Sequence, residues 1–315
     1  MSEFFRALEQ ARQDRQQRND PEPPTPSVRA ATGPTDMIRT PAVPEQGLTT
    51  DRVGEEIVDG VDDRLVSLLT PDSFAAEQYR TLRHFVEQKH TETNLAVLAV
   101  ASPGSREGKT TTTINLAGAI AQARDTKVLI VDADLRAPAV KDMLGLRGVQ
   151  RRGLVDAIVS GLSLDDVIIE LPTFNLSVVG TGETSGAPYE LLKSPRFGQF
   201  LAEARERFDY VLLDTPPVVA VPDCRVIATS VDGFFIVVTA HKTPMRALAD
   251  SLDALGPRKT VGLIFNADDG LLVRGAYYGY KPSPEGRGIT GWSRAIRRVR
   301  RSRVPSAAAT GSQSS

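Results

Sequence analysis

The chain has 315 residues, 41% of them hydrophobic and 24% charged, and a formal net charge of −1. This composition is globular and excludes a collagen-like, a wholly disordered or a disulfide-stapled chain. One cysteine and three histidines cannot build a Cys/His zinc site, and neither an apolar run of about 18 residues nor a signal-peptide pattern is found, so a cytoplasmic protein is predicted.

Two segments precede the predicted domain. Residues 1–18 carry apolar side chains at helical spacing on a polar background, which predicts a short amphipathic helix. Residues 19–64 are rich in proline and threonine, a composition that cannot pack a core and predicts a disordered, flexible linker. We therefore expect the folded domain to begin near residue 65.

Alternating apolar runs and helical patterns predict an α/β domain over residues 65–274. Pro71-Asp72-Ser73 is expected to begin a helix. Six strands are expected, at residues 95–101, 127–131, 176–179, 210–213, 233–238 and 260–265. Helices are expected at 109–123, 187–208 and 244–255, with short helices inside 137–174. Strands that are apolar on both faces and alternate with helices indicate a doubly wound, mostly parallel sheet.

A glycine-rich loop follows the first predicted strand and opens a helix. A strand-to-helix turn at Gly108-Lys109-Thr110 directs backbone N–H groups and the positive helix terminus to one point, which suits a polyphosphate. Lys109 would neutralise its oxygens and Thr110 would ligate Mg²⁺. The alternative is a surface loop that happens to be rich in glycine. The residues expected to bind ATP are Gly104, Ser105, Arg106, Glu107, Gly108, Lys109, Thr110 and Thr111.

Aspartates follow two further strands at the same predicted edge of the sheet. Asp132 and Asp134 come after the strand at 127–131, and alternation puts both on one side of the edge where open α/β sheets bind ligands. Asp214 follows the strand at 210–213 and would hold Mg²⁺ directly or through water. An aspartate at a strand end often only caps a turn, but three beside a phosphate loop favour a metal and a proton acceptor.

The combination of motifs resembles the bacterial tyrosine kinases (BY-kinases) of capsule and exopolysaccharide synthesis, over about residues 65–280. The resemblance lies in SPGSREGKTTT, which is similar to S-x-x-P-G-E-G-K-[ST], and in LIVDADLRAP and VLLDTPP. It implies a P-loop NTPase fold of the MinD/ParA type. It also implies an ATP-dependent protein-tyrosine autokinase that regulates the polymerisation and export of exopolysaccharide or capsule.

The resemblance implies roles for five residues of the loop and the aspartate clusters. Lys109 and Thr110 would bind the phosphates and Mg²⁺, Lys109 being one of the catalytic residues. Asp132 would act as the base toward a tyrosine hydroxyl. Asp134 would be catalytic and, with Asp214, would hold the metal.

Further residues are matched outside these clusters. Arg136 is expected near the ATP site. Asn266 matches an asparagine that contacts adenine in the wider superfamily, although a turn asparagine explains it nearly as well. The motif of Glu77, Arg80 and Arg83 matches the one through which these kinases associate into homo-oligomeric rings. On the residues alone, an ordinary helix-surface pair of Glu77 and Arg80 is favoured over a subunit contact.

The C-terminal part divides into two predicted segments. Residues 275–286 contain Tyr277, Tyr278 and Tyr280, which the resemblance implies are autophosphorylation sites, while exposed aromatics also serve as binding anchors. Residues 287–315 contain seven arginines and no acidic residue and are expected to be largely disordered. An anionic membrane surface and plain solvation remain open for this segment, and nucleic acid is less favoured.

Partners and location follow from the resemblance. Because no transmembrane segment is predicted, a separate membrane chain-length regulator (polysaccharide co-polymerase) is expected as activator, together with a cognate phosphatase. The N-terminal helix is one candidate docking element. The protein is expected at the inner face of the plasma membrane, as a peripheral protein.

Two other functions remain open. One is a ParA/MinD-like ATPase switch without kinase activity, against which stand the tyrosine cluster and Gly104, at the position where those ATPases carry a lysine. The other is a noncatalytic nucleotide-binding scaffold, motivated by Ser105 and Arg106, which replace the usual Pro-Gly of the family's loop.

Overall fold

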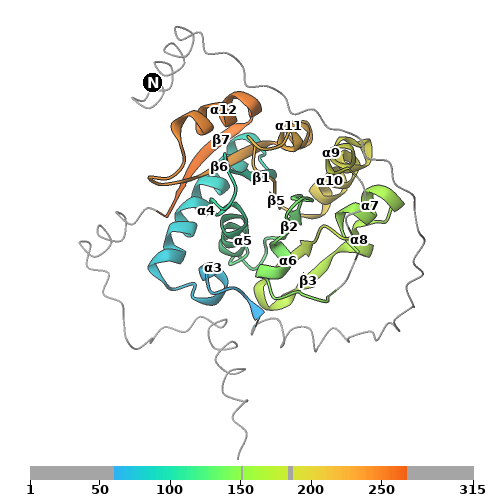
Figure 1. The fold of residues 1–315 in the computed structure, drawn as a ribbon. Helices are drawn as coiled ribbons and strands as arrows, with labels where there is room; N and C mark the ends of the chain where they lie inside the picture. The colour runs from blue at the N-terminus through green and yellow to red at the C-terminus, as the bar shows by residue number, and fades with distance from the viewer. Residues whose placement is uncertain (1–59, 150–151, 184–186, 268–315) are drawn as a thin grey trace, which may run out of the picture. The chain divides into compact units, whose positions relative to one another are not determined.

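Seven strands in the described part of the chain form one sheet (Figure 1). A computed structural model describes residues 60–149, 152–183 and 187–267. The predicted N-terminal helix, nearly all of the linker, the tyrosine cluster and the basic segment lie outside these residues. The strands are β1 (Val97–Ala101), β2 (Val128–Asp132), β3 (Ile169–Leu171), β4 (Leu176–Val179), β5 (Tyr210–Asp214), β6 (Gly233–Thr239) and β7 (Thr260–Asn266).

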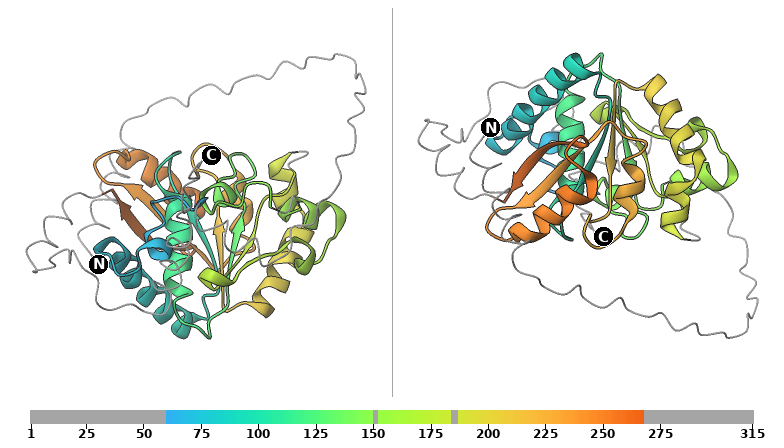
Figure 2. Two further views of the ribbon diagram at one scale, coloured as in Figure 1. Left: turned by 90° about the horizontal axis from the view of Figure 1, so that it is seen from below. Right: turned by 90° about the horizontal axis from the view of Figure 1, so that it is seen from above.

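The strand order is β3-β4-β2-β5-β1-β6-β7, and every neighbouring pair is parallel except β3 with β4. The helices are α3 (Val66–Leu69), α4 (Phe74–Thr93), α5 (Lys109–Ile120), α6 (Val140–Met143), α7 (Leu154–Ser160), α8 (Leu164–Val167), α9 (Pro188–Lys193), α10 (Pro195–Arg207), α11 (Asp223–Ile227) and α12 (Met245–Leu255). Helices α4 and α5 cover one face of the sheet, and α10 and α12 the other (Figure 2). The predicted doubly wound, mostly parallel α/β fold is confirmed.

The core on the α4 and α5 face is built by alternate residues of the central strands. Leu98, Ile130 and Leu212 are each fully buried there and pack with side chains of α3 to α6. Burying one such side chain stabilises the fold by about 1.5–3 kcal/mol. Val61 belongs to the same cluster, and the N–H of Asp62 donates to the carbonyl of Met143 at 2.9 Å. The packed part of the chain thus begins before residue 65, inside the segment assigned to the linker.

Helix α4 begins where its sequence predicts. The Ser73 side chain accepts the N–H of Ala76 at 3.2 Å, a standard N-cap. Asn94 closes the helix in the left-handed conformation, with φ of 55°. Tyr79 and Val86 lie on its inner side, and burial raises the pKa of the Tyr79 hydroxyl.

Some predicted elements differ from the structure. The single helix expected over residues 187–208 is two helices, because Ser194 ends α9 and caps α10, whose first residue is Pro195. Proline is suited to the first position of a helix but interrupts an existing one. The segment 137–174 contains short helices as expected, but it also contains the antiparallel strand β3, followed by a 3-10 helix at Pro172–Phe174.

Strand order brings the functional loops together. β5 lies between β1 and β2, and Asp132 pairs in register with Asp214. Val100, just before the loop that follows β1, is in register with Asp214 as well. The carboxyl ends of three adjacent parallel strands therefore meet at one edge, the usual ligand site of such sheets.

Candidate active site

The loop between β1 and α5 is shaped by Gly108 and Asn266. Gly108 has φ of 93°, in the left-handed region where glycine is favoured. A Cβ at this position would lie 2.1 Å from Nδ2 of Asn266. That amide donates to the Glu107 carbonyl oxygen at 3.0 Å. Asn266 thus lies against the loop, where it holds the turn, and its predicted contact with adenine stays a prediction.

The Glu107 side chain stabilises the conformation of the loop through hydrogen bonds to the loop backbone and to Thr243. Its carboxylate accepts the N–H of Gly104 at 2.9 Å and the hydroxyl of Thr243 at 2.5 Å. Ser102 donates its own hydroxyl to the Gly104 carbonyl at 2.6 Å. The loop is therefore joined to the segment between β6 and α12. The sequence gives no signal for Thr243, because a threonine in a connecting segment matches no motif.

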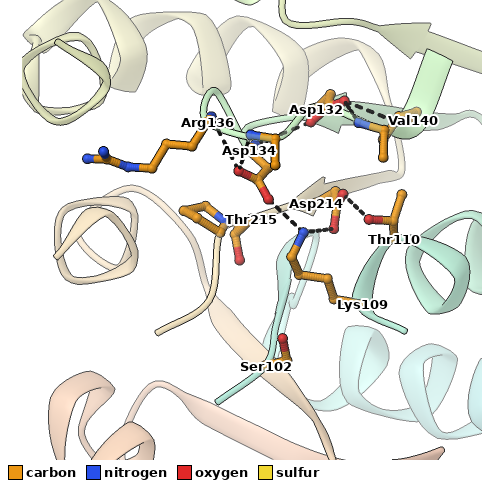
Figure 3. A network of polar contacts seen from close by, with 12 residues as sticks. Ser102, Lys109, Thr110, Asp132, Asp134, Arg136, Val140, Asp214 and Thr215 are labelled. Carbon is orange, nitrogen blue, oxygen red and sulfur yellow. Dashed lines mark hydrogen bonds and ion pairs between the residues drawn. The ribbon is translucent and has the colours of Figure 1, made fainter. Parts of the chain in front are cut away.

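The ammonium of Lys109 lies between two carboxylates (Figure 3). Its Nζ is 2.7 Å from Oδ2 of Asp134 and 3.7 Å from Oδ1 of Asp214. Burial lowers the pKa of Lys109, but the charges of Asp214 and Asp134 outweigh this and raise it above its usual value. Lys109 is therefore positively charged and is held in place at the N-terminal end of α5.

Asp214 is the most buried acid of the site, and one of its oxygens accepts no hydrogen bond. Oδ2 accepts the hydroxyl of Thr110 at 2.6 Å, while Oδ1 is buried without a hydrogen-bond partner. Burial raises the pKa of Asp214 to about 6, although Lys109 and Thr110 oppose the shift. Within the described ranges no group of three or more His, Cys, Asp or Glu side chains forms a metal site by itself. A buried carboxylate oxygen that accepts no hydrogen bond, beside a hydroxyl, nevertheless fits Mg²⁺, which usually takes one or two protein ligands and completes its shell with phosphates and water.

Asp132 is 1% exposed and is held by backbone N–H groups. Its carboxylate accepts from Ala139 and Val140, both at 3.1 Å, and from Asp134 at 3.2 Å. Burial, helped by the charges of Asp214 and Asp134, raises the pKa of Asp132 to about 8. A carboxyl group with this pKa suits proton transfer near neutral pH.

A cavity of about 350 Å³ opens beside Asp132, within the size range of small-molecule sites. Its lining comes from the segment around α6 and from the turn after β4. The lining residues are Asp132, Pro138, Ala139, Lys141, Asp142, Arg147, Gly148, Thr181 and Gly182.

Arg136 does not face the cluster around Lys109 but points away from it (Figure 3). Its guanidinium makes a two-pronged ion pair with Asp223 of α11, with Nε and one terminal nitrogen at 2.8 and 3.0 Å from the carboxylate oxygens. Hydrogen bonding to Asp223 raises the pKa of Arg136. Asp223 is 1% exposed and was not predicted, since a lone aspartate after a single proline carries no signal of its own.

The remaining loop residues differ in exposure. Ser105 and Arg106 are exposed at the tip of the loop, and Arg106 has φ of 61°. Thr111 is half-buried in the first turn of α5, where its carbonyl accepts the side-chain amide of Asn115 at 2.9 Å.

The predicted association motif makes contacts within its own domain. Arg80 pairs with Glu77, its neighbour one turn away on α4. Arg83 donates to Glu87 at 2.6 Å and to the carbonyl of Ala119, near the end of α5, at 3.0 Å. These residues lie on α4, apart from the aspartate cluster, and their role in assembly stays a prediction.

A glycine-rich loop between a buried strand and a helix, with acids on the neighbouring strands, defines a P-loop nucleotide-binding protein. A family model described as an AAA domain matches residues 96–255. Tyrosine-protein kinase YwqD of Bacillus subtilis is 32% identical over 218 residues, which are 69% of this chain and 90% of that protein. Tyrosine-protein kinase ptk of Acinetobacter johnsonii is 31% identical over 60% of this chain, and the match spans only 25% of that longer protein.

The kinase domain of the Escherichia coli tyrosine kinase ETK is similar in structure, with a TM-score of 0.60 and 30% identity over 64% of this chain and 79% of that domain. The chain belongs to the bacterial tyrosine-protein kinase family. It is therefore an enzyme that binds a nucleotide and transfers phosphate to tyrosine, and an ATPase switch without kinase activity is not favoured. None of the described helices is long and apolar enough to cross a bilayer.

Proposed function

We propose that the protein is an ATP- and Mg²⁺-dependent tyrosine autokinase. It acts on Tyr277, Tyr278 and Tyr280 of its own C-terminal segment and thereby regulates the polymerisation and export of exopolysaccharide or capsule. The observation that supports this best is the position of Lys109, between the carboxylates of Asp134 and Asp214 and at the start of the loop helix.

Each residue of the cluster has a role in this proposal. Lys109 binds phosphate oxygens and neutralises charge as it develops. Thr110 and Asp214 hold Mg²⁺ through the hydroxyl and the carboxylate oxygen that accepts no hydrogen bond, with Asp134 beside them. When bound, ATP supplies the phosphoryl group and Mg²⁺ neutralises its oxygens.

Asp132 accepts the proton of the attacking tyrosine hydroxyl. The cavity beside it is open to the outside of the domain and is large enough for a ring side chain, which supports entry of a tyrosine there. A base with a pKa of about 8 is partly ionised at neutral pH and is strong enough to assist proton removal.

Assembly and location complete the proposal. Glu77, Arg80 and Arg83 mediate homo-oligomerisation, so that one subunit's tyrosines reach a neighbour's site. A membrane chain-length regulator (polysaccharide co-polymerase) activates the kinase, and a cognate phosphatase reverses the reaction. Residues 287–315 hold the protein peripherally on the anionic inner face of the plasma membrane, as their seven arginines would favour. We do not expect nucleic acid as a partner.

The kinase and its alternatives are separated by one assay. The purified chain is incubated with ATP and Mg²⁺, with and without the cytoplasmic part of a co-polymerase, and phosphotyrosine and ADP are measured together. The proposal predicts phosphotyrosine in the wild type and none in Lys109→Met. ADP release without phosphotyrosine would establish an ATPase, and absence of both with nucleotide bound would establish a scaffold.

A further inference from the structure

Arg106 adopts a backbone conformation that arginine rarely takes. Its φ of 61° lies in the left-handed region, where a Cβ is disfavoured and glycine is free. The loop motif that this sequence resembles has glycine at the same position. A residue suited to the turn is thus replaced by one that strains it. Strained conformations held at ligand loops point to a role for the side chain.

The charge of Arg106 is not used within the described domain. The side chain is exposed and makes no ion pair with any residue in the described ranges. Other arginines near the site are engaged, since Arg136 pairs with Asp223 and Arg147 with Asp142.

Negative charge exceeds positive charge among the described residues of the site. The carboxylates of Asp134 and Asp214 flank the ammonium of Lys109, and the buried carboxylate of Asp132 accepts the N–H of Asp134 (Figure 3). A polyphosphate entering this site adds several negative charges, which repel the carboxylates at low effective dielectric. A second cation on the loop would offset part of this repulsion.

Arginine is the side chain best suited to that task. Its planar guanidinium donates two parallel N–H groups to phosphate oxygens and keeps its charge at every physiological pH. Its position, two residues before Gly108, is within the loop whose backbone N–H groups bind phosphates in P-loop proteins.

We propose that the Arg106 guanidinium binds the polyphosphate of the nucleotide directly, as a cation that this chain adds to its loop at the cost of backbone strain. The proposal rests on the proposed function only for the identity of the ligand. On this proposal, the change from glycine to Arg106 strengthens nucleotide binding.

The test measures equilibrium binding of ATP and ADP, with Mg²⁺, by calorimetry on the full chain. Arg106→Gln and Arg106→Gly remove the charge, Arg106→Lys keeps it, and Arg124→Gln removes an exposed charge at the far end of α5. We expect Kd for ATP to rise about tenfold or more in the first two. Arg106→Lys should lie between them and the wild type, and Arg124→Gln should match the wild type.

Thermal unfolding without nucleotide provides a second readout. Because glycine relieves the strain, Arg106→Gly should raise the unfolding midpoint by about 2 °C while it weakens ATP binding. A gain in stability with a loss of affinity is not what a merely structural arginine would show.

Two outcomes would overturn the proposal. One is an ATP affinity in Arg106→Gln equal to that of the wild type, and the other is an equal loss in Arg124→Gln, which would make the effect one of net charge alone. Failure of the kinase proposal looks different: the wild type would bind ATP without forming phosphotyrosine, and the Arg106 variants would still lose affinity.

Discussion

The hydroxyl of Thr110 donates a hydrogen bond of 2.6 Å to the carboxylate of Asp214, joining the first turn of α5 to the end of β5. It satisfies one oxygen of a fully buried acid, while the other accepts no hydrogen bond and lies 3.7 Å from the Lys109 ammonium. The same contact places a hydroxyl and a carboxylate oxygen side by side, as a Mg²⁺ site requires.

Thr110→Ser and Thr110→Val form a matched pair for this contact. Serine keeps the hydroxyl, so autophosphorylation should stay within a few-fold of the wild type. Valine keeps the shape but leaves Asp214 without its donor, which should destabilise the nucleotide-free protein by about 1–3 kcal/mol and abolish Mg²⁺-dependent activity. Urea unfolding and a phosphotyrosine assay measure the two effects. Wild-type activity in Thr110→Val would remove the threonine from the metal site.

Lys109→Met should lower the rate of phosphotransfer by roughly 100-fold or more, because a fixed charge aimed at the transferring group is lost. The effect of Lys109→Met on the free energy of unfolding should depend on pH. At low pH the buried carboxylates are protonated and need no cation, whereas at high pH they are ionised and lose Lys109 as partner. Denaturant unfolding at several pH values tests this, and a constant loss of stability across them would argue against electrostatic coupling.

Raised pKa values at Asp132 and Asp214, about 8 and about 6, fix the sign of a stability change with pH. Both carboxyls bind protons more tightly in the folded than in the unfolded protein. Their contribution is therefore present at low pH and is lost as the pH rises from about 4 to about 8. We expect the free energy of unfolding, without nucleotide, to fall over this range.

Asp132→Asn should reduce the fall of the free energy of unfolding with rising pH, because it removes the group with the higher pKa. The lowered pKa of Asp62, about 2, acts below this window and does not mask it. A free energy of unfolding that is constant or rises between about pH 5 and pH 8 would contradict raised pKa values at these two acids.

Gly108→Ala tests the shape of the loop. The added methyl group meets the Asn266 amide and is also strained by φ of 93°. Gly148→Ala is the control, since its φ is 82° and no atom lies within 4 Å of the added Cβ. The control should cost about 1 kcal/mol for the backbone alone. Gly108→Ala should lower the free energy of unfolding by more than the control does and should abolish nucleotide binding. Equal losses of stability in the two variants would mean that the Asn266 side chain moves aside without cost.

The site could be predicted from sequence where each residue follows its own strand. Asp132 and Asp214 come at the ends of apolar runs, Lys109 opens the helix after the loop that follows another such run, and parallel strands end at one edge. What could not be predicted is the strand order, which sets Asp132 opposite Asp214. The pairing of Arg136 with Asp223 depends on that order and on a short helix that no periodicity signals.

The fold, like the site, could be predicted from the sequence only in part. Strands flanked by helices were found from apolar runs, while β3 was missed because three residues are too few for a pattern. The contact of Asn266 with Gly108 spans most of the domain in sequence. Only packing of the last strand beside the loop reveals that this asparagine supports the turn.

The central claim is that this site transfers phosphate to the protein's own tyrosines with Asp132 as base. Its most direct test is phosphopeptide mapping by mass spectrometry of the full chain after incubation with ATP and Mg²⁺, in the wild type and in Asp132→Asn. The account predicts phosphotyrosine confined to residues 277–280 of the wild type and at most a trace in the variant. Equal labelling of both proteins, or ATP consumption by the wild type with no phosphotyrosine, would contradict it.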